Sequence, residues 1–142
     1  MYTAVVLDDI SRNSITHDFH NWITLPKHWV KKAHHVTLNM GPLDDELNDS
    51  SILGEVCHIN TDKYYLAYDE GIIALGVTNM YISLGHPIPL DVEVNSINKH
   101  PHITMYHHPD VAPKKSNDVM ATCKRVTPFK FRLTGKVKVI NK

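Results

Sequence analysis

The sequence predicts an α+β fold that is built mainly from antiparallel strands, with two or three helices. Segments in which apolar and polar residues alternate, as in half-buried strands, recur at 35–40, 100–106 and 128–140. A helical spacing of apolar residues occurs at 11–23, and no repeat of fixed period divides the chain. No Gly-, Pro- or Ser-rich stretch interrupts residues 1–142, so we expect one domain.

The chain begins with a predicted strand and a predicted helix. Residues 2–7 are rich in β-prone side chains and end at a pair of aspartates. Ser11 is a suitable cap for a helix that runs to about Ile23, because apolar residues then recur at spacings that place them on one helical face. Pro26 disfavours helical backbone at the residue before it and therefore ends the helix.

The rest of the chain is predicted to be mostly strand. The segment 35–40 ends at a Gly-Pro turn. Later strands or extended pieces are expected at 52–59, 64–67, 71–77 and 80–83, around Pro87 and Pro89, and at 100–106. Ser116 opens a short helix that reaches residue 126. The last strand covers 128–140, where Gly135 marks a bulge or a turn.

Composition and charge argue against several classes of function. Hydrophobic residues make up 42% and charged residues 21% of the chain, as in ordinary folded domains. Fifteen basic and fifteen acidic residues cancel, so the sequence lacks the basic field that long nucleic acids or anionic membranes attract. No apolar run approaches the roughly 20 residues that cross a bilayer, and the first residues do not resemble a signal peptide. With only two cysteines, Cys57 and Cys123, we expect a protein of the reducing cytoplasm.

Histidine is unusually frequent, with 11 residues, and two of them begin the same short motif. The segments 35–38 (His-Val-Thr-Leu) and 102–105 (His-Ile-Thr-Met) share the order His, aliphatic, Thr, aliphatic, although they lie in distant parts of the chain. Because residues i and i+2 of a strand point to the same face, each histidine projects beside its threonine while the aliphatic residues enter a core. If the two strands are neighbours in a sheet, two imidazoles and two hydroxyls converge.

Four such side chains can act on a phosphodiester. Imidazole has an ordinary pKa of about 6.5, so near neutral pH one ring of the pair His35 and His102 can be neutral and the other protonated. The neutral ring can take a proton from an attacking water or 2′-hydroxyl, and the protonated ring can give a proton to the departing oxygen. The hydroxyls of Thr37 and Thr104 can donate to phosphate oxygens. This chemistry requires no metal.

The two motifs resemble the signature of the two-histidine (2H) phosphoesterases, which is a pair of His-x-Thr or His-x-Ser segments with hydrophobic neighbours. The segments 5–8, 11–12 and 33–41 also resemble one branch of that family, which is found in phages, bacteria and RNA-repair proteins. The likeness covers most of the chain. It implies two α+β lobes whose antiparallel sheets meet at a central cleft, with flanking helices and one motif on each side. The chain departs from the family in its compactness, because no second helix is evident before the second motif.

The resemblance also implies an enzyme that cleaves phosphodiesters without a metal or other cofactor. His35 and His102 would form the acid–base pair, and Thr37 and Thr104 would hold the phosphate. One substrate class is a cyclic nucleotide or cyclic oligonucleotide immune signal, which resembling phage proteins destroy (anti-CBASS activity); the other is the 2′,3′-cyclic phosphate at a short RNA end. The near-zero net charge and the compact chain favour the first class. We expect no membrane and no stable protein partner.

Four further residues are candidates for contacts with a substrate. Tyr2 and Tyr106 can stack on a base, and in a regular strand Tyr106 continues the face of His102 at i+4. Arg12 and Lys124 can neutralise the charge of a phosphate.

Other interpretations of the sequence stay open. Histidines at 34–35, 100–102 and 107–108 could be combined into a zinc site, but no Asp, Glu or Cys joins them at a recognised spacing, and His34 is expected to face away from His35. A module that binds nucleotides or RNA without turnover is the alternative of another class, although both motif histidines are intact. A purely structural role is the weakest of these interpretations.

Overall fold

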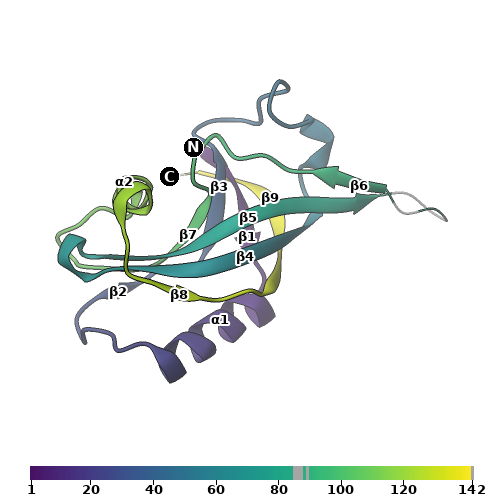
Figure 1. Cartoon of the computed structure of the whole chain (residues 1–142). Coiled ribbons are helices and arrows are strands. Elements are labelled where there is room, and N and C mark those ends of the chain that lie inside the picture. Colours follow the sequence, from purple (N-terminus) through teal and green to yellow (C-terminus); the bar gives the residue numbers. More distant parts are fainter. Residues whose placement is uncertain (85–87, 89, 142) are drawn as a thin grey trace.

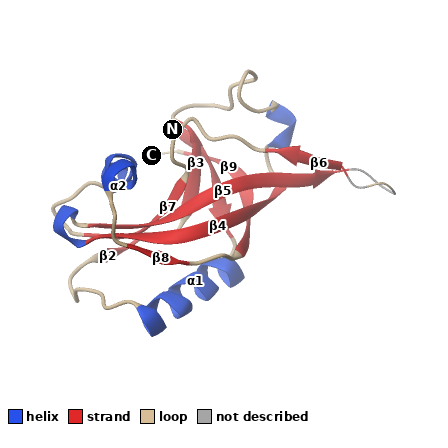
Figure 2. Ribbon diagram, in the orientation of Figure 1, coloured by secondary structure: helices blue, strands red, loops and turns tan. Residues whose placement is uncertain are grey.

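The computed structural model describes residues 1–84, 88 and 90–141, without the side chains of residues 20–22 (Figure 1). It confirms the predicted α+β class, because strands are the main secondary structure and α-helices accompany them (Figure 2). The helices are α1 (Asp9–Trp22) and α2 (Ser116–Thr122), with the 3-10 helices η1 (Ser50–Ile52), η2 (Tyr68–Glu70) and η3 (Pro113–Lys115). Among the described residues, no helix has the length and apolar character needed to cross a membrane.

The longer strands form a closed, barrel-like sheet. They are β1 (Tyr2–Leu7), β3 (His35–Asn39), β4 (Val56–Ala67), β5 (Ile72–Leu84), β7 (His102–His107) and β9 (Arg132–Ile140). Neighbours pair in the order β1–β3–β7–β5–β4–β9, and β9 pairs with β1 to complete the ring. All of these pairings are antiparallel. Short strands extend the ring, namely β2 (Val30–Lys31) along β7, β6 (Leu90–Glu93) along β5 and β8 (Val126–Pro128) along β4.

The interior of the barrel is the main hydrophobic core. Alternate strand residues point inward, so that Val5, Val36 and Ile103, on β1, β3 and β7, are fully buried. Helix α1 lies below the strands in Figure 1, and its Ile15 and Phe19 join this core. These two residues are four apart, which places them on one face of the helix.

A smaller hydrophobic cluster lies on the outer surface of the barrel. It contains Ile72 and Ala74 of β5, which alternate with the inward-facing Ile73 and therefore point outward. Val119 and Met120 of α2 complete the cluster. Helix α2 therefore covers part of the outer face of β5.

Two pairs of predicted strands are each one continuous strand, β4 and β5. The register between β4 and β5 shifts on both sides of Thr61. This threonine is buried, and its hydroxyl donates to the carbonyl of Phe129 at 2.8 Å. Such an irregularity interrupts the period of two in the sequence without ending the strand, which is why the sequence indicated separate elements.

The helix ends differ from the predictions by a few residues. Asp8, not Ser11, caps α1: its carboxylate accepts the backbone N–H of Ser11 at 2.8 Å. An aspartate at this position satisfies an N–H that the first turn leaves open. Helix α2 ends at Thr122 and not near residue 126, since residues 126–128 pair with β4 as β8.

The predicted strand at 128–140 is largely β9. Gly135 does not form the predicted turn or bulge, because it pairs with Leu7 on one side and Cys57 on the other, within a regular part of the ladder. The extended pieces predicted around Pro87 and Pro89 lie outside the described residues.

Candidate functional site

The two His-x-Thr segments lie on neighbouring antiparallel strands, β3 and β7. Val36 pairs with Ile103, and both side chains are fully buried inside the barrel. Residues before and after an inward-facing strand residue point to the opposite face. The outer face of the barrel therefore receives the four candidate side chains, His35 and Thr37 from β3 and His102 and Thr104 from β7.

The register brings the two motifs together in opposite directions. Extending the Val36–Ile103 pair by one residue places Thr37 opposite His102. His35 lies one residue before Val36 on β3 and His102 lies one residue before Ile103 on β7, so the two histidines flank this pair. Two imidazoles that flank one residue pair on the same face can approach one phosphate from both sides.

His102 is held in one tautomer by its own strand. Its Nδ1 lies 2.9 Å from the carbonyl oxygen of His100, and because a carbonyl only accepts, Nδ1 carries the hydrogen. Nε2 of the neutral ring then bears the lone pair. The side chain is 9% exposed, and this burial lowers the pKa of His102 below its ordinary value of 6.5, while the hydrogen bond to His100 partly opposes the shift. At neutral pH His102 is therefore a proton acceptor.

His35 is half-buried, and its ring lies close to two other rings. Its Nδ1 is 3.0 Å from Nδ1 of His34, so one nitrogen donates and the other accepts. The Tyr2 ring also lies near His35, with the ring centroids 5.2 Å apart and the ring planes tilted by 42°. The expectation that His34 faces away from His35 is wrong, because His34 precedes β3 and the alternation of side chains along a strand does not apply to it.

The two threonines differ in what their hydroxyls contact. Thr104 Oγ1 lies 2.9 Å from Oγ of Ser116, which is fully buried at the start of α2. The Thr37 hydroxyl makes no hydrogen bond to any described residue, although its backbone carbonyl accepts from Ser96 at 2.7 Å. Thr37 therefore has the hydroxyl that is available to a ligand, whereas the hydroxyl of Thr104 ties α2 to β7.

This difference predicts unequal effects of two matched substitutions on stability. Thr104→Ala leaves the buried Ser116 hydroxyl without its partner and is expected to lower the free energy of unfolding by about 1–3 kcal/mol. Thr37→Ala is expected to change stability by less than about 0.5 kcal/mol. Urea unfolding of both variants measures this, and equal losses of stability would contradict the assignment.

Tyr106 does not share the outer face, so the prediction of a substrate contact there is wrong. Its ring is 2% exposed and packs in the core, 4.8 Å from Phe19 between centroids. The pairing of β7 with β5 shifts between Ile73 and Ala74, which makes Met105 an extra residue in β7. A bulge of this kind reverses the alternation of side chains beyond it. Of the two predicted tyrosines, Tyr2 alone lies beside a motif histidine.

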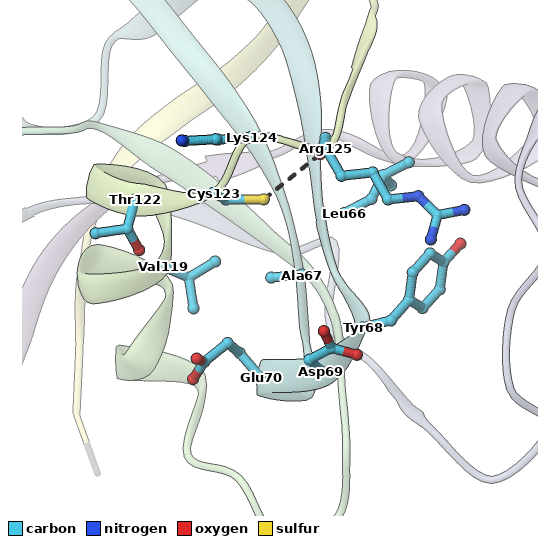
Figure 3. Close-up of a pocket in the computed structure, with 10 residues that line it drawn as sticks. All are labelled: Leu66, Ala67, Tyr68, Asp69, Glu70, Val119, Thr122, Cys123, Lys124 and Arg125. Atoms are coloured by element: carbon cyan, nitrogen blue, oxygen red, sulfur yellow. Dashed lines mark hydrogen bonds between the residues drawn. The ribbon is translucent and has the colours of Figure 1, made fainter.

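Arg12 and Lys124, the predicted phosphate contacts, lie in different places. The Arg12 guanidinium donates through Nε to the carbonyl of Ala33 at 3.0 Å and through Nη2 to that of Lys32 at 3.1 Å. Lys124 lines a cavity of about 270 Å³ between α2 and the end of β4 (Figure 3). The residues that line this cavity include none of the four motif residues.

Sequence reasoning missed two side chains that contact the motifs, His34 and Ser116. The sequence shows two adjacent histidines at 34–35. Their ring contact depends on the local backbone conformation, which the periodicity of the sequence does not show. Ser116 was predicted as a helix cap, whereas Lys115 occupies the cap position of α2 and Ser116 contacts Thr104.

Among the described residues, the histidines at 34–35, 100–102 and 107–108 do not gather into a metal site. No group of three or more His, Cys, Asp or Glu side chains gathers as a metal site in the part of the chain that the structure describes. The Nδ1 atom of His107 donates to the carbonyl of His108 at 2.9 Å, much as His102 does to His100.

Comparison of the chain with protein-family models, with curated proteins and with solved structures found no match.

Proposed function

We propose that this protein is a metal-independent phosphodiesterase whose site is the outer face of β3 and β7. The observation that carries the proposal is the antiparallel pairing of the two His-x-Thr segments, which puts two imidazoles and two hydroxyls on one face. Phosphoryl chemistry of this kind needs one proton acceptor and one proton donor on opposite sides of a phosphorus atom, together with donors to its oxygens.

His102 is the general base in this proposal, and His35 is the general acid. Nε2 of His102 takes a proton from a water or a ribose 2′-hydroxyl as the oxygen forms its bond to phosphorus. The bond from phosphorus to the departing ribose oxygen breaks, and that oxygen takes a proton from His35. The assignment is supported by the hydrogen bond from Nδ1 of His102, which leaves Nε2 as the acceptor. Thr37 donates to a phosphate oxygen.

The proposed substrate is a cyclic nucleotide or cyclic oligonucleotide signal, as in phage immune evasion in a host cytoplasm. Tyr2, beside His35, offers a ring on which a base next to the reacting phosphate can stack. Near-zero net charge supports a small ligand over a long polyanion. The two-lobed arrangement of the 2H family would then have its lobes meeting along β3 and β7.

A substrate panel tests the function directly. The wild-type protein is incubated with cyclic di- and trinucleotides, with 3′,5′-cyclic mononucleotides and with an RNA ending in a 2′,3′-cyclic phosphate, with and without EDTA, and products are identified by mass spectrometry. We expect opening of a cyclic nucleotide in the presence of EDTA. Turnover of the RNA end alone would favour RNA repair, and tight binding without any product would favour a nucleotide-binding module. Activity that EDTA abolishes would overturn the metal-independent mechanism.

The rate should depend on pH in a way that reports the environment of His102. As pH falls, protonation of His102 removes the base; because burial lowers its pKa, the acid limb of kcat/KM is expected to have its midpoint below 6.5. At high pH the rate falls again as the proton donor is lost, which gives a bell. A pH series of initial rates measures this. An acid limb with its midpoint above 6.5 would contradict His102 as the base.

A further inference from the structure

The backbone takes an unusual conformation just before the first motif. Ala33 has a φ of +48°, and among the described residues it is the one non-glycine with a positive φ. The residue is also fully buried. Residues with a Cβ avoid this region because the Cβ atom crowds the neighbouring carbonyl oxygen. A buried alanine keeps such a conformation where the surrounding contacts hold it there.

The turn at Ala33 is coupled to a bulge at residues 34–35. The Ala33 N–H donates to the carbonyl of Thr104 at 2.8 Å, and the next pair along the ladder joins Val36 to Ile103. The chain thus advances by three residues, from Ala33 to Val36, while β7 advances by one residue, from Thr104 to Ile103. His34 and His35 are the extra residues of this bulge, which brings their Nδ1 atoms within 3.0 Å of each other.

Arg12 of α1 holds the backbone of this turn. Its Nε and Nη2 donate to the adjacent carbonyls of Ala33 and Lys32, at 3.0 and 3.1 Å. The next carbonyl, of His34, accepts from the Leu7 N–H at 2.9 Å. Guanidinium is a planar group whose donors point in fixed directions, so it can bridge two neighbouring carbonyls. Lysine offers a single ammonium on a flexible chain and cannot reproduce that bridge.

We propose that Arg12 is a positioning residue for His35. By fixing the carbonyls on either side of the left-handed turn, it maintains the bulge and hence the contact of the His35 ring with His34. Its catalytic consequence rests on the proposed function, whereas its effect on the ring contact does not. The guanidinium donors that face the turn are already used by the protein, which distinguishes this role from a phosphate contact.

Kinetics of Arg12→Lys and Arg12→Ala test the catalytic consequence. A displacement of the order of 1 Å at a reacting group can cost about 10²-fold, so we expect kcat to fall by about 10- to 100-fold. KM should stay within about twofold, because ground-state binding is not removed. Guanidinium ion added to Arg12→Ala is expected to restore part of kcat. Arg125→Ala is the matched control, since the Arg125 guanidinium lies 4.9 Å from the Tyr68 ring centroid, at the cavity between α2 and the end of β4.

The ring contact can be measured in the ligand-free protein. Imidazole ¹⁵N spectra distinguish the tautomers of His34, His35 and His102. In Arg12→Lys we expect the signals of His34 and His35 to change and those of His102, which bonds to the carbonyl of His100, to stay. If Arg12→Ala fails to fold, Arg12→Lys, which keeps the charge, decides the comparison.

Each remaining outcome overturns one of the two ideas. A raised KM with unchanged kcat in Arg12→Lys would make Arg12 a substrate contact. A lower melting temperature with unchanged His34 and His35 spectra would make it a purely structural residue. Either result overturns the positioning role. If the wild-type protein turns over nothing in the substrate panel, the proposed function fails, while the spectra still decide whether Arg12 orders the His35 ring.

Discussion

Replacing His102 with alanine is expected to lower the rate of phosphodiester cleavage by about 10²–10⁴-fold, and replacing His35 should have a similar effect. The reason is that each ring performs one of the two proton transfers. When either ring is removed, water must perform that transfer instead. Initial rates at saturating substrate measure the effect on kcat. Non-additivity is also expected: the double variant should be little slower than either single variant, because the rings act as a unit.

Two further variants make this result interpretable. His102→Asn keeps a side-chain donor that can reach the His100 carbonyl but has no group to take a proton, so it should fold like the wild type and be as slow as His102→Ala. His17, exposed on α1, is the matched control, and His17→Ala should retain full activity. An active His102→Asn variant would show that this ring is not the base.

Replacing Phe19 with alanine is expected to lower the free energy of unfolding by about 3–5 kcal/mol, the largest effect on stability that we predict. The Phe19 ring is fully buried, with its centroid 5.4 Å from that of Tyr64 in an edge-on contact and 4.8 Å from that of Tyr106. Truncation would therefore open a cavity where α1 meets the barrel interior. Urea unfolding followed by far-ultraviolet circular dichroism measures the change.

A surface residue of the same helix provides the control for this prediction. Ile10 is 82% exposed, so Ile10→Ala should change stability by less than about 0.5 kcal/mol. A small loss in Phe19→Ala would mean that α1 contributes little to the core. In that event the packing of Tyr64 and Tyr106 against the helix would need another explanation.

Much of the fold follows from patterns that are local in the sequence. Strand β3 and the first residues of β7 were predicted nearly to the residue, because residues such as Val36 and Ile103 alternate with polar neighbours as a half-buried strand requires. What the sequence did not show is where that period breaks. Met105 is an extra residue that turns Tyr106 into the core, and Thr61 occupies a shift in β4. Both irregularities depend on the strand that pairs with them, which composition and spacing do not specify.

The candidate site also has a part that the sequence predicts and a part that depends on tertiary structure. His35, Thr37, His102 and Thr104 could be selected in advance, because a repeated pattern is visible without knowing the topology. The contacts of Arg12 with the Ala33 and Lys32 carbonyls could not, since they join a helix to a turn that only tertiary structure brings together. The sequence analysis assigned the Arg12 guanidinium to a phosphate of the substrate. In the structure the guanidinium donates to these two backbone carbonyls.

The place of β9 in the ring has a consequence for how the chain is made. Among the strands of the barrel it is the last to be synthesised, yet it lies between β1 and β4 and pairs with both. A nascent chain that lacks it exposes two adjacent strand edges, the kind of surface that pairs readily with other chains. Chains truncated before residue 132 should therefore aggregate more readily than chains that contain β9, and the ring cannot close until β9 has been synthesised.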